Sequence, residues 1–210
     1  MEIETKGNKH KHKNILKSII KGYFFGILFF VLIFLWMLYP LAYDWVWGDK
    51  VVEDHISNLL GNETDYYVVV PILLNWIETE THYPTEKEAL WVLGNGWGLY
   101  WIEGNLRFFH RGIPASWVIK SKLGRCGEDS TYFVEIMKEL GYNARRIHPD
   151  GWDHSWSEFY TPAGIKIHID PSGFRVIEDP VEFASKSNWT TIWAENEDGS
   201  KENVSIEYIK

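Results

Sequence analysis

The uncharged stretch from Gly22 to Tyr43 constrains this chain more than any other feature of its sequence. As an α-helix it would span about 33 Å, slightly more than the hydrocarbon core of a bilayer. A core helix of a soluble protein rarely stays apolar on every face for about six turns. Trp and Tyr residues crowd its C-terminal end, where amphipathic rings favour a membrane interface. We therefore expect residues 22–43 to form a transmembrane helix, with the lipid bilayer as its partner.

A cleaved signal peptide is the main alternative for this segment. The apolar run is longer than the roughly 7–15 residues usual in such a peptide. The sequence Pro40-Leu41-Ala42-Tyr43 also matches a small-residue cleavage site poorly. We therefore favour an uncleaved signal anchor.

Charge is distributed unevenly on the two sides of this anchor. Residues 1–21 carry six Lys and two Glu, a net charge of +4, whereas the other 189 residues carry 15 basic and 27 acidic side chains, a net charge of −12. The positive-inside rule predicts a single-pass protein of the cell membrane, with a cytoplasmic tail at 1–21 and an extracytoplasmic domain. Glycosylation sequons at Asn62, Asn188 and Asn203 are compatible with that side. The Lys/His mixture of residues 8–13 could bind a metal or acidic lipid, but a solvated tail is the simpler interpretation.

The part beyond the anchor has the size of one domain. With 167 residues after Tyr43 and 12 Trp in the whole chain, a substantial core is expected. The single Cys excludes an internal disulfide and a zinc site built from paired Cys. The net charge of −8 argues against nucleic acid as a partner, because phosphate binding needs a basic face.

Apolar spacing predicts helices first and strands later in this domain. Helical patterns cover residues 51–60, 68–80, 114–122 and 126–140. A further helix is expected over 84–93, starting at Pro84, and a loop is expected at 94–98. Strands are predicted at 143–148, 154–160 and 165–170, with a final hairpin over 189–195 and 203–209. The fold class is α+β, with a helical part at 44–112 and a core at 113–210 in which helices pack on an antiparallel sheet.

Cys126, His154 and Asp170 are expected to meet at one end of this layer. The helix after Cys126 carries the chain away by about 21 Å, and the strand at 143–149 brings it back by about 23 Å. If the next turn centres near residues 162–163, paired residue numbers sum to about 325, so His154 faces residue 170 or 171. Asp170 stands at that place.

A thiol, an imidazole and a carboxylate in this arrangement form an activated nucleophile. A helix N-terminus and a neighbouring imidazolium both stabilise a thiolate, and Asp170 can orient the ring of His154. Taken singly, each residue has an ordinary interpretation: a buried small Cys, a packed strand His, and an Asp in a turn before Pro171. Their joint placement favours the catalytic interpretation.

These motifs resemble the transglutaminase-like superfamily, a branch of the papain-like thiol enzymes. The resemblance covers about Pro114 to Gly173, and its pieces are Gly124-Arg125-Cys126-Gly127-Glu128, Leu140-Gly141-Tyr142-Asn143-Ala144-Arg145, Asp153-His154-Ser155-Trp156-Ser157-Glu158 and Ile169-Asp170-Pro171. The Cys and His segments are most similar to those of peptide:N-glycanases, which cleave the amide joining a glycan to Asn.

The resemblance implies that Cys126 is the nucleophile, His154 the general acid/base and Asp170 the orienting carboxylate. It also implies an upstream side chain that assists the oxyanion, for which the candidates are Trp91, Trp97, Trp101 and Trp117. Trp156 and Glu158 share a face with His154 by the period of two, so we expect them to wall or brace the site. We count Trp97 and Trp117 with them as candidate substrate-pocket residues.

One departure from the glycanases is clear. Those of eukaryotic type carry paired Cys-x-x-Cys zinc ligands, whereas this chain has only Cys126. No calcium-binding loop of EF-hand type occurs either, although cross-linking transglutaminases use calcium. We expect no metal and no cofactor.

The sequence thus predicts a membrane-anchored thiol enzyme that cleaves or transfers an amide through a Cys thioester. A cysteine protease or amidase acting on a peptide, glycopeptide or cell-envelope amide fits this description. Two alternatives stay open. One is a non-catalytic cell-surface module that binds peptide or polysaccharide on the same fold, and the other is transfer of the acyl group to an amine.

Overall fold

The computed structural model describes most of the chain in two compact units, residues 1–42 and 43–210. The described residues are 4–93, 97–102, 104–109, 112–151, 154–196 and 199–209. Helix α1 (Glu4–Leu60) supplies the secondary structure of the first unit and continues into the second, with Pro40 inside it. Each unit is described by itself below.

The helix of the first unit exposes large apolar side chains. Phe24 is 62% exposed and Phe30 is 71% exposed. Within the described residues, no single helix meets the length and hydropathy expected of a membrane span. The consecutive pieces Ile19–Leu35 and Leu38–Leu60 satisfy these length and hydropathy criteria only when taken together, and the helix bends by 43° between the two pieces.

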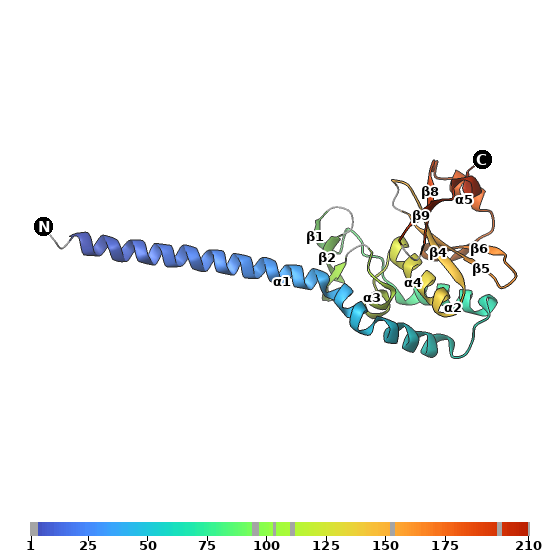
Figure 1. Ribbon diagram of the computed structural model, residues 1–210, viewed down its shortest axis with the longest axis horizontal. Coiled ribbons are helices and arrows are strands. Elements are labelled where there is room, and N and C mark those ends of the chain that lie inside the picture. Colours follow the sequence, from blue (N-terminus) through green and yellow to red (C-terminus); the bar gives the residue numbers. More distant parts are fainter. Residues whose placement is uncertain are drawn as a thin grey trace. The chain divides into compact units, whose positions relative to one another are not determined.

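The second unit combines short helices with two antiparallel sheets (Figure 1). Its further helices are α2 (Tyr66–Glu80), α3 (Ala115–Ser121), α4 (Cys126–Glu139), the 3₁₀ turn η1 (Pro171–Gly173), α5 (Pro180–Ser185) and α6 (Ser205–Tyr208). The small sheet contains β1 (Ala89–Leu93), β2 (Trp97–Ile102) and β3 (Asn105–Phe109), in that order. The large sheet has the order β7-β6-β5-β4-β8-β9, formed by β4 (Asn143–Pro149), β5 (Trp156–Tyr160), β6 (Lys166–Asp170), β7 (Arg175–Ile177), β8 (Ile192–Glu195) and β9 (Lys201–Asn203).

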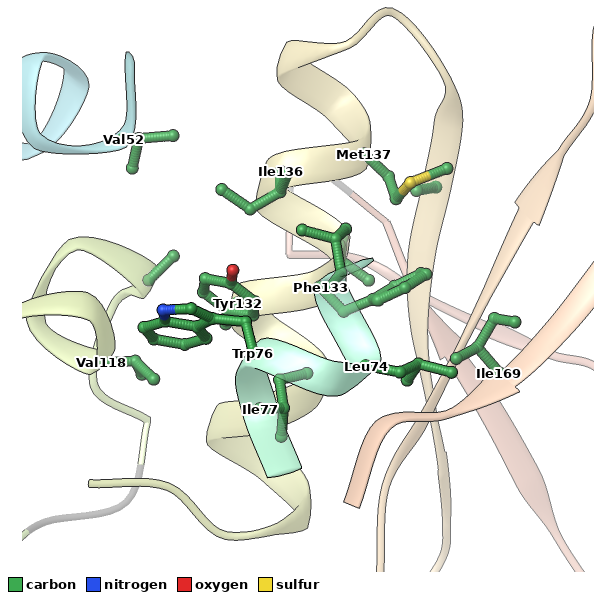
Figure 2. Packing of buried hydrophobic residues seen from close by; sticks show 14 of the residues in the cluster. Val52, Leu74, Trp76, Ile77, Val118, Tyr132, Phe133, Ile136, Met137 and Ile169 are labelled. Atoms are coloured by element: carbon green, nitrogen blue, oxygen red, sulfur yellow. The ribbon is translucent and has the colours of Figure 1, made fainter. Parts of the chain in front are cut away.

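Helix α4 packs between the large sheet and α2. Its first turn is acidic and its last turn contains Lys138, as the helix dipole favours. Gly141 follows with φ of 87°, a conformation that ends a helix and suits glycine. Tyr132 stacks on Trp76 of α2 with 4.5 Å between ring centroids (Figure 2). The buried face of α4 therefore fixes the helix, and with it the level of Cys126, against the sheet.

A second core covers the opposite face of the large sheet. Its buried members are Ile147, Trp156, Ile177, Ala184, Trp189, Ile192, Ala194, Val204 and Tyr208. Successive strand residues point to opposite faces, so Phe159 joins the α4 side while Trp156 joins this second core. The sheet consequently has a packed layer on both sides.

The α+β class is confirmed, and so are the helices at the predicted positions of α2, α3 and α4. The helix expected over 84–93 is wrong, because Ala89–Leu93 is strand β1 paired with β2. The run Ala-Leu-Trp-Val-Leu is short enough for either structure, and pairing with a neighbouring strand decided it. The part expected to be helical therefore includes a three-stranded sheet.

The predicted final hairpin is correct only in its first half. Trp193 pairs with Asn203 and Glu195 with Lys201, so β8 and β9 do form a hairpin. The second strand was expected over 203–209, but β9 ends at Asn203 and Ser205–Tyr208 is helix α6. The aromatic ring of Tyr208 is buried in the second core, which a single turn of helix makes possible.

Candidate active site

Cys126 is the first residue of α4, as the sequence predicts. The residue is partly buried and its thiol forms no disulfide. The preceding residue, Arg125, caps the helix with extended backbone, and its guanidinium donates to the carbonyl of Pro84 at 3.1 Å. Arg125 also lies over the rings of Tyr83 and Phe109, at 5.0 and 5.4 Å from their centroids. These contacts hold the start of α4 in place.

His154 and Asp170 face each other at the end of the large sheet. Ser157 pairs with Ile169 and Tyr160 with Lys166, so paired numbers sum to 326, close to the expected 325. Nε2 of His154 lies 3.7 Å from Oδ1 of Asp170. His154 itself stands just before β5 rather than inside it.

The carboxylate of Asp170 is held from several directions. Oδ1 accepts hydrogen bonds from the hydroxyl of Ser172 at 3.1 Å and from the backbone N–H of Gly173 at 3.2 Å. Oδ2 accepts from the guanidinium of Arg175 at 3.2 Å. Asp170 is only 3% exposed, so these donors replace water around a buried charge.

Two pockets meet at His154. Cys126 and His154 both line the first, which has a volume of about 290 Å³ and is called the thiol pocket below. His154 and Asp170 both line the second, of about 390 Å³. The structure thus brings the three residues of the predicted constellation together around one imidazole ring.

Three aromatic side chains surround that ring. Trp156 and Trp189 stack on His154, with ring centroids 6.1 and 5.9 Å away and interplanar angles of 28° and 18°. Phe183 approaches at 6.0 Å. Trp156 was predicted to wall or brace the site, whereas Phe183 and Trp189 lie beyond the motifs and were missed. An aromatic pair shortly after the Asp motif was the available signal, but nothing in its spacing pointed to His154.

Glu158 lies deep beneath the site. Its side chain is fully buried and accepts from Nε of Arg145 at 2.6 Å and from the hydroxyl of Tyr208 at 2.9 Å. Tyr208 in turn packs edge-on against Trp156, at 5.3 Å between centroids. Glu158 is absent from the described lining of both pockets, and its bond to Tyr208 connects it to Trp156.

The other predicted pocket residues are placed differently. Trp117 packs against Tyr43, at 5.5 Å between centroids, and is absent from the described lining of either pocket. Trp101 is 53% exposed on the small sheet. The side chains of Trp91 and Trp97, and the loop residues 94–96, lie outside the described part of the chain.

Asp129 is a buried acid that sequence reasoning did not single out. It lies one turn after Cys126, is 4% exposed, and its Oδ1 lacks a hydrogen-bond partner among the described residues. Burial, with the nearby charges of Glu128 and Asp170, raises the pKa of Asp129 to about 8. A Cβ at position 124 would lie 2.1 Å from Oδ1 of Asp129, so a glycine at the start of the Cys motif leaves room for this carboxyl group.

The polar residues around the thiol pocket do not group as metal ligands. In the ranges that the structure describes, no cluster of three or more His, Cys, Asp or Glu side chains could hold a metal ion.

Comparison with known proteins places this site in a family context. Residues 99–171 match the model of the transglutaminase-like superfamily. Two curated relatives are both named peptide-N(4)-(N-acetyl-beta-glucosaminyl)asparagine amidase. The one from Drosophila melanogaster is 37% identical over 76 residues, which are 36% of this chain and 12% of that protein. The one from Kluyveromyces lactis is 33% identical over 104 residues, which are 46% of this chain and 27% of that protein.

The chain thus spans only a small part of the length of the curated relatives that it matches. The matched family segment includes Cys126, His154 and Asp170. The resemblance inferred from the sequence motifs is therefore confirmed: residues 99–171 match the transglutaminase-like superfamily, and part of the chain is similar to two proteins named as asparagine amidases.

Proposed function

We propose that this protein is a cysteine-dependent amide hydrolase that acts on the side-chain amide of glycosylated Asn in peptides. The observation that carries the proposal is the shared pocket of Cys126 and His154, with Asp170 beside the imidazole. The two relatives that match part of this chain are named as asparagine amidases, which supports the substrate class.

In the first step, the thiolate of Cys126 attacks the amide carbonyl carbon. A sulfur–carbon bond forms and the carbonyl oxygen becomes an oxyanion. The first N–H groups of a helix have no partner within the helix, so the start of α4 offers donors for that charge. His154 then donates its proton to the leaving nitrogen, the carbon–nitrogen bond breaks, and an acyl thioester remains on Cys126.

In the second step, water hydrolyses the thioester. Neutral His154 takes a proton from the attacking water, and the carbon–sulfur bond breaks as the thiolate leaves. The products are an Asp side chain on the peptide and the amine-bearing glycan. Throughout, Asp170 orients the imidazole and stabilises its charged form.

The test uses the full chain in detergent micelles and a synthetic peptide that carries N-acetylglucosamine on Asn. Mass spectrometry should show conversion of that Asn to Asp together with release of the sugar. Cys126→Ser should abolish the conversion, while Glu139→Gln, an exposed change on the same helix, should leave it unaltered. Conversion that survives Cys126→Ser would refute the mechanism.

The alternatives give different results in the same assay. An added amine that appears covalently attached to the peptide would indicate transfer instead of hydrolysis. Binding of the glycopeptide without any conversion, by the wild type and by Cys126→Ser alike, would favour a non-catalytic binding module.

We further propose that residues 22–43 anchor the protein in the cell membrane, with the N-terminus cytoplasmic and the catalytic domain outside. The uncharged sequence, the six Lys before it and the exposed Phe side chains of α1 support this proposal. Alkaline carbonate extraction of membranes should leave the full chain in the pellet. Release into the supernatant would contradict the anchor, and protease treatment of intact cells tests the orientation.

A further inference from the structure

The thiol pocket is basic although the domain around it is acidic. Outside residues 1–21 the chain has a net charge of −12. The pocket is nevertheless lined by three Lys or Arg side chains and two Glu: Arg125, Arg146, Lys201, Glu128 and Glu195. The charged side chains that line the pocket therefore have a net charge opposite in sign to that of the surrounding domain.

Three of these side chains form one row across neighbouring strands. Arg146 of β4 pairs in register with Glu195 of β8, which pairs with Lys201 of β9. Directly opposed residues in antiparallel strands share a face of the sheet. Nη1 of Arg146 lies 3.4 Å from the hydroxyl of Thr131 on α4, so the row is on the face that carries Cys126.

Both acids of the pocket already have partners. Glu195 accepts from Nε of Arg146 at 3.0 Å. Glu128 is 3% exposed, and its Oε1 accepts from the backbone N–H of Gly112 at 3.0 Å. Because Glu195 is bonded to Arg146, it compensates only part of the charge of Lys201, which is exposed and has no ion pair among the described residues.

His148 completes the wall two residues after Arg146. The alternation of β4 puts both side chains on the same face. Burial and the charges of Lys201 and Arg146 lower the pKa of His148, while Glu195 opposes this effect. A neutral His148 can donate one hydrogen bond without adding charge.

We propose that Arg146, His148 and Lys201 form a carboxylate subsite beside Cys126, which selects acidic peptides. Lys201 supplies an exposed positive charge, and Arg146 and His148 supply directed N–H donors. The carboxylate belongs to an acidic side chain, or to a free peptide C-terminus, next to the amide that Cys126 attacks. The assignment to a peptide substrate rests on the proposed function, whereas the anion preference of the pocket does not.

Alkylation of Cys126 by two small reagents tests the subsite without any substrate. Iodoacetate and iodoacetamide both form a sulfur–carbon bond and release iodide, but only iodoacetate is an anion. The measured quantity is the rate with iodoacetate divided by the rate with iodoacetamide. Comparing this ratio on the full chain with the same ratio on a neutral model thiol isolates the effect of charge. We expect this ratio to be about tenfold higher on Cys126 at low salt and to fall as salt screens the site.

Substitutions at Lys201 should move this ratio in a graded way. Lys201→Gln should lower it several-fold, and Lys201→Glu should bring it below that of the model thiol. Lys138→Gln is the matched control, because Lys138 lies about 18 Å from Cys126 along α4. General changes in thiol ionisation cancel in the ratio.

The outcomes separate the subsite from the proposed reaction. The subsite alone is overturned if iodoacetamide labels Cys126 rapidly but the ratio equals that of the model thiol. It is also overturned if Lys201→Glu leaves the ratio unchanged. A high ratio without cleavage of any glycopeptide overturns the proposed reaction alone. If neither reagent labels Cys126 in the folded protein, the thiol pocket is inaccessible and both proposals fail.

Glycopeptides then distinguish the sources of the carboxylate. The first peptide carries Asp beside the glycosylated Asn and has an amidated C-terminus. The second has neutral side chains and a free C-terminus beside that Asn. The third carries Lys in place of the Asp of the first. We expect one of the two acidic peptides to be cleaved with at least tenfold higher kcat/KM than the Lys peptide. Lys201→Glu should reduce or invert this preference, and equal rates for all three peptides would contradict acidic selectivity.

Discussion

His154 and Asp170 approach across the end of the large sheet, with 3.7 Å between Nε2 and Oδ1. This separation is longer than a hydrogen bond and is common for catalytic pairs before substrate binds. Meanwhile Asp170 is kept in place by Ser172, Gly173 and Arg175. The carboxylate is therefore fixed independently of the imidazole that it is proposed to orient.

Asp170→Asn should separate charge from geometry. The amide oxygen can still accept from the N–H of Gly173, so the turn should persist, but the negative charge beside His154 is lost. We expect kcat for amide cleavage to fall by about 10³- to 10⁴-fold, as for other triads with this change. Ser172→Ala removes one donor to the same carboxylate and should have a much smaller effect. Equal losses in the two variants would argue that Asp170 acts only through local structure.

Removing Arg145 should destabilise the fold strongly. Its partner Glu158 is fully buried, so Arg145→Met removes the bonded guanidinium and leaves the carboxylate with the more distant ammonium of Lys166, at 3.4 Å. We expect a loss of about 3 kcal/mol or more in the free energy of unfolding, measured by urea denaturation. Lys186→Met breaks an exposed i,i+4 pair with Glu182 and should cost less than about 0.5 kcal/mol. A small effect for Arg145→Met would show that other groups around Glu158 suffice to compensate it.

Trp189 should stabilise the charged form of His154. Its ring is stacked on the imidazole, and an aromatic face attracts a cation by about 1 kcal/mol. Trp189→Leu should therefore raise the pH at which Cys126 becomes reactive toward iodoacetamide, by up to about one unit. Trp189→Phe keeps an aromatic face and should shift it less. A reactivity profile that is the same in both variants and in the wild type would limit Trp189 to packing.

Asp129 should make the fold less stable as pH rises. Its pKa is raised from 3.8 to about 8 by burial and by the charges of Glu128 and Asp170, so the folded state keeps a proton that the unfolded chain releases. Stability from this group is present below about pH 4 and is lost progressively as pH rises toward 8.

Asp129→Asn should remove this part of the pH dependence. The variant should gain stability relative to the wild type at pH 8, by an amount of the order of several kcal/mol, and gain little at pH 4. Urea denaturation at the two pH values measures the difference. Glu139→Gln, at an exposed position of the same helix, is the control and should show no such divergence. A pH-independent gain for Asp129→Asn would contradict a protonated Asp129.

The sequence alone determined the helix that begins at Cys126, the three strands that follow it, and the meeting of His154 with Asp170. These elements are local and strongly patterned, and their lengths fix where the chain returns. The motifs also predicted the resemblance to the transglutaminase-like superfamily, whose model matches residues 99–171.

Tertiary structure decided what local pattern leaves open. The run at 89–93 became a strand because β2 pairs with it, and Ser205–Tyr208 became a helix that buries Tyr208 against Trp156. Trp189 reached His154, and Lys201 joined the row of Arg146, only through pairings and packing between segments distant in sequence. Such contacts depend on which faces remain to be covered once the sheet has formed, and no local spacing encodes that.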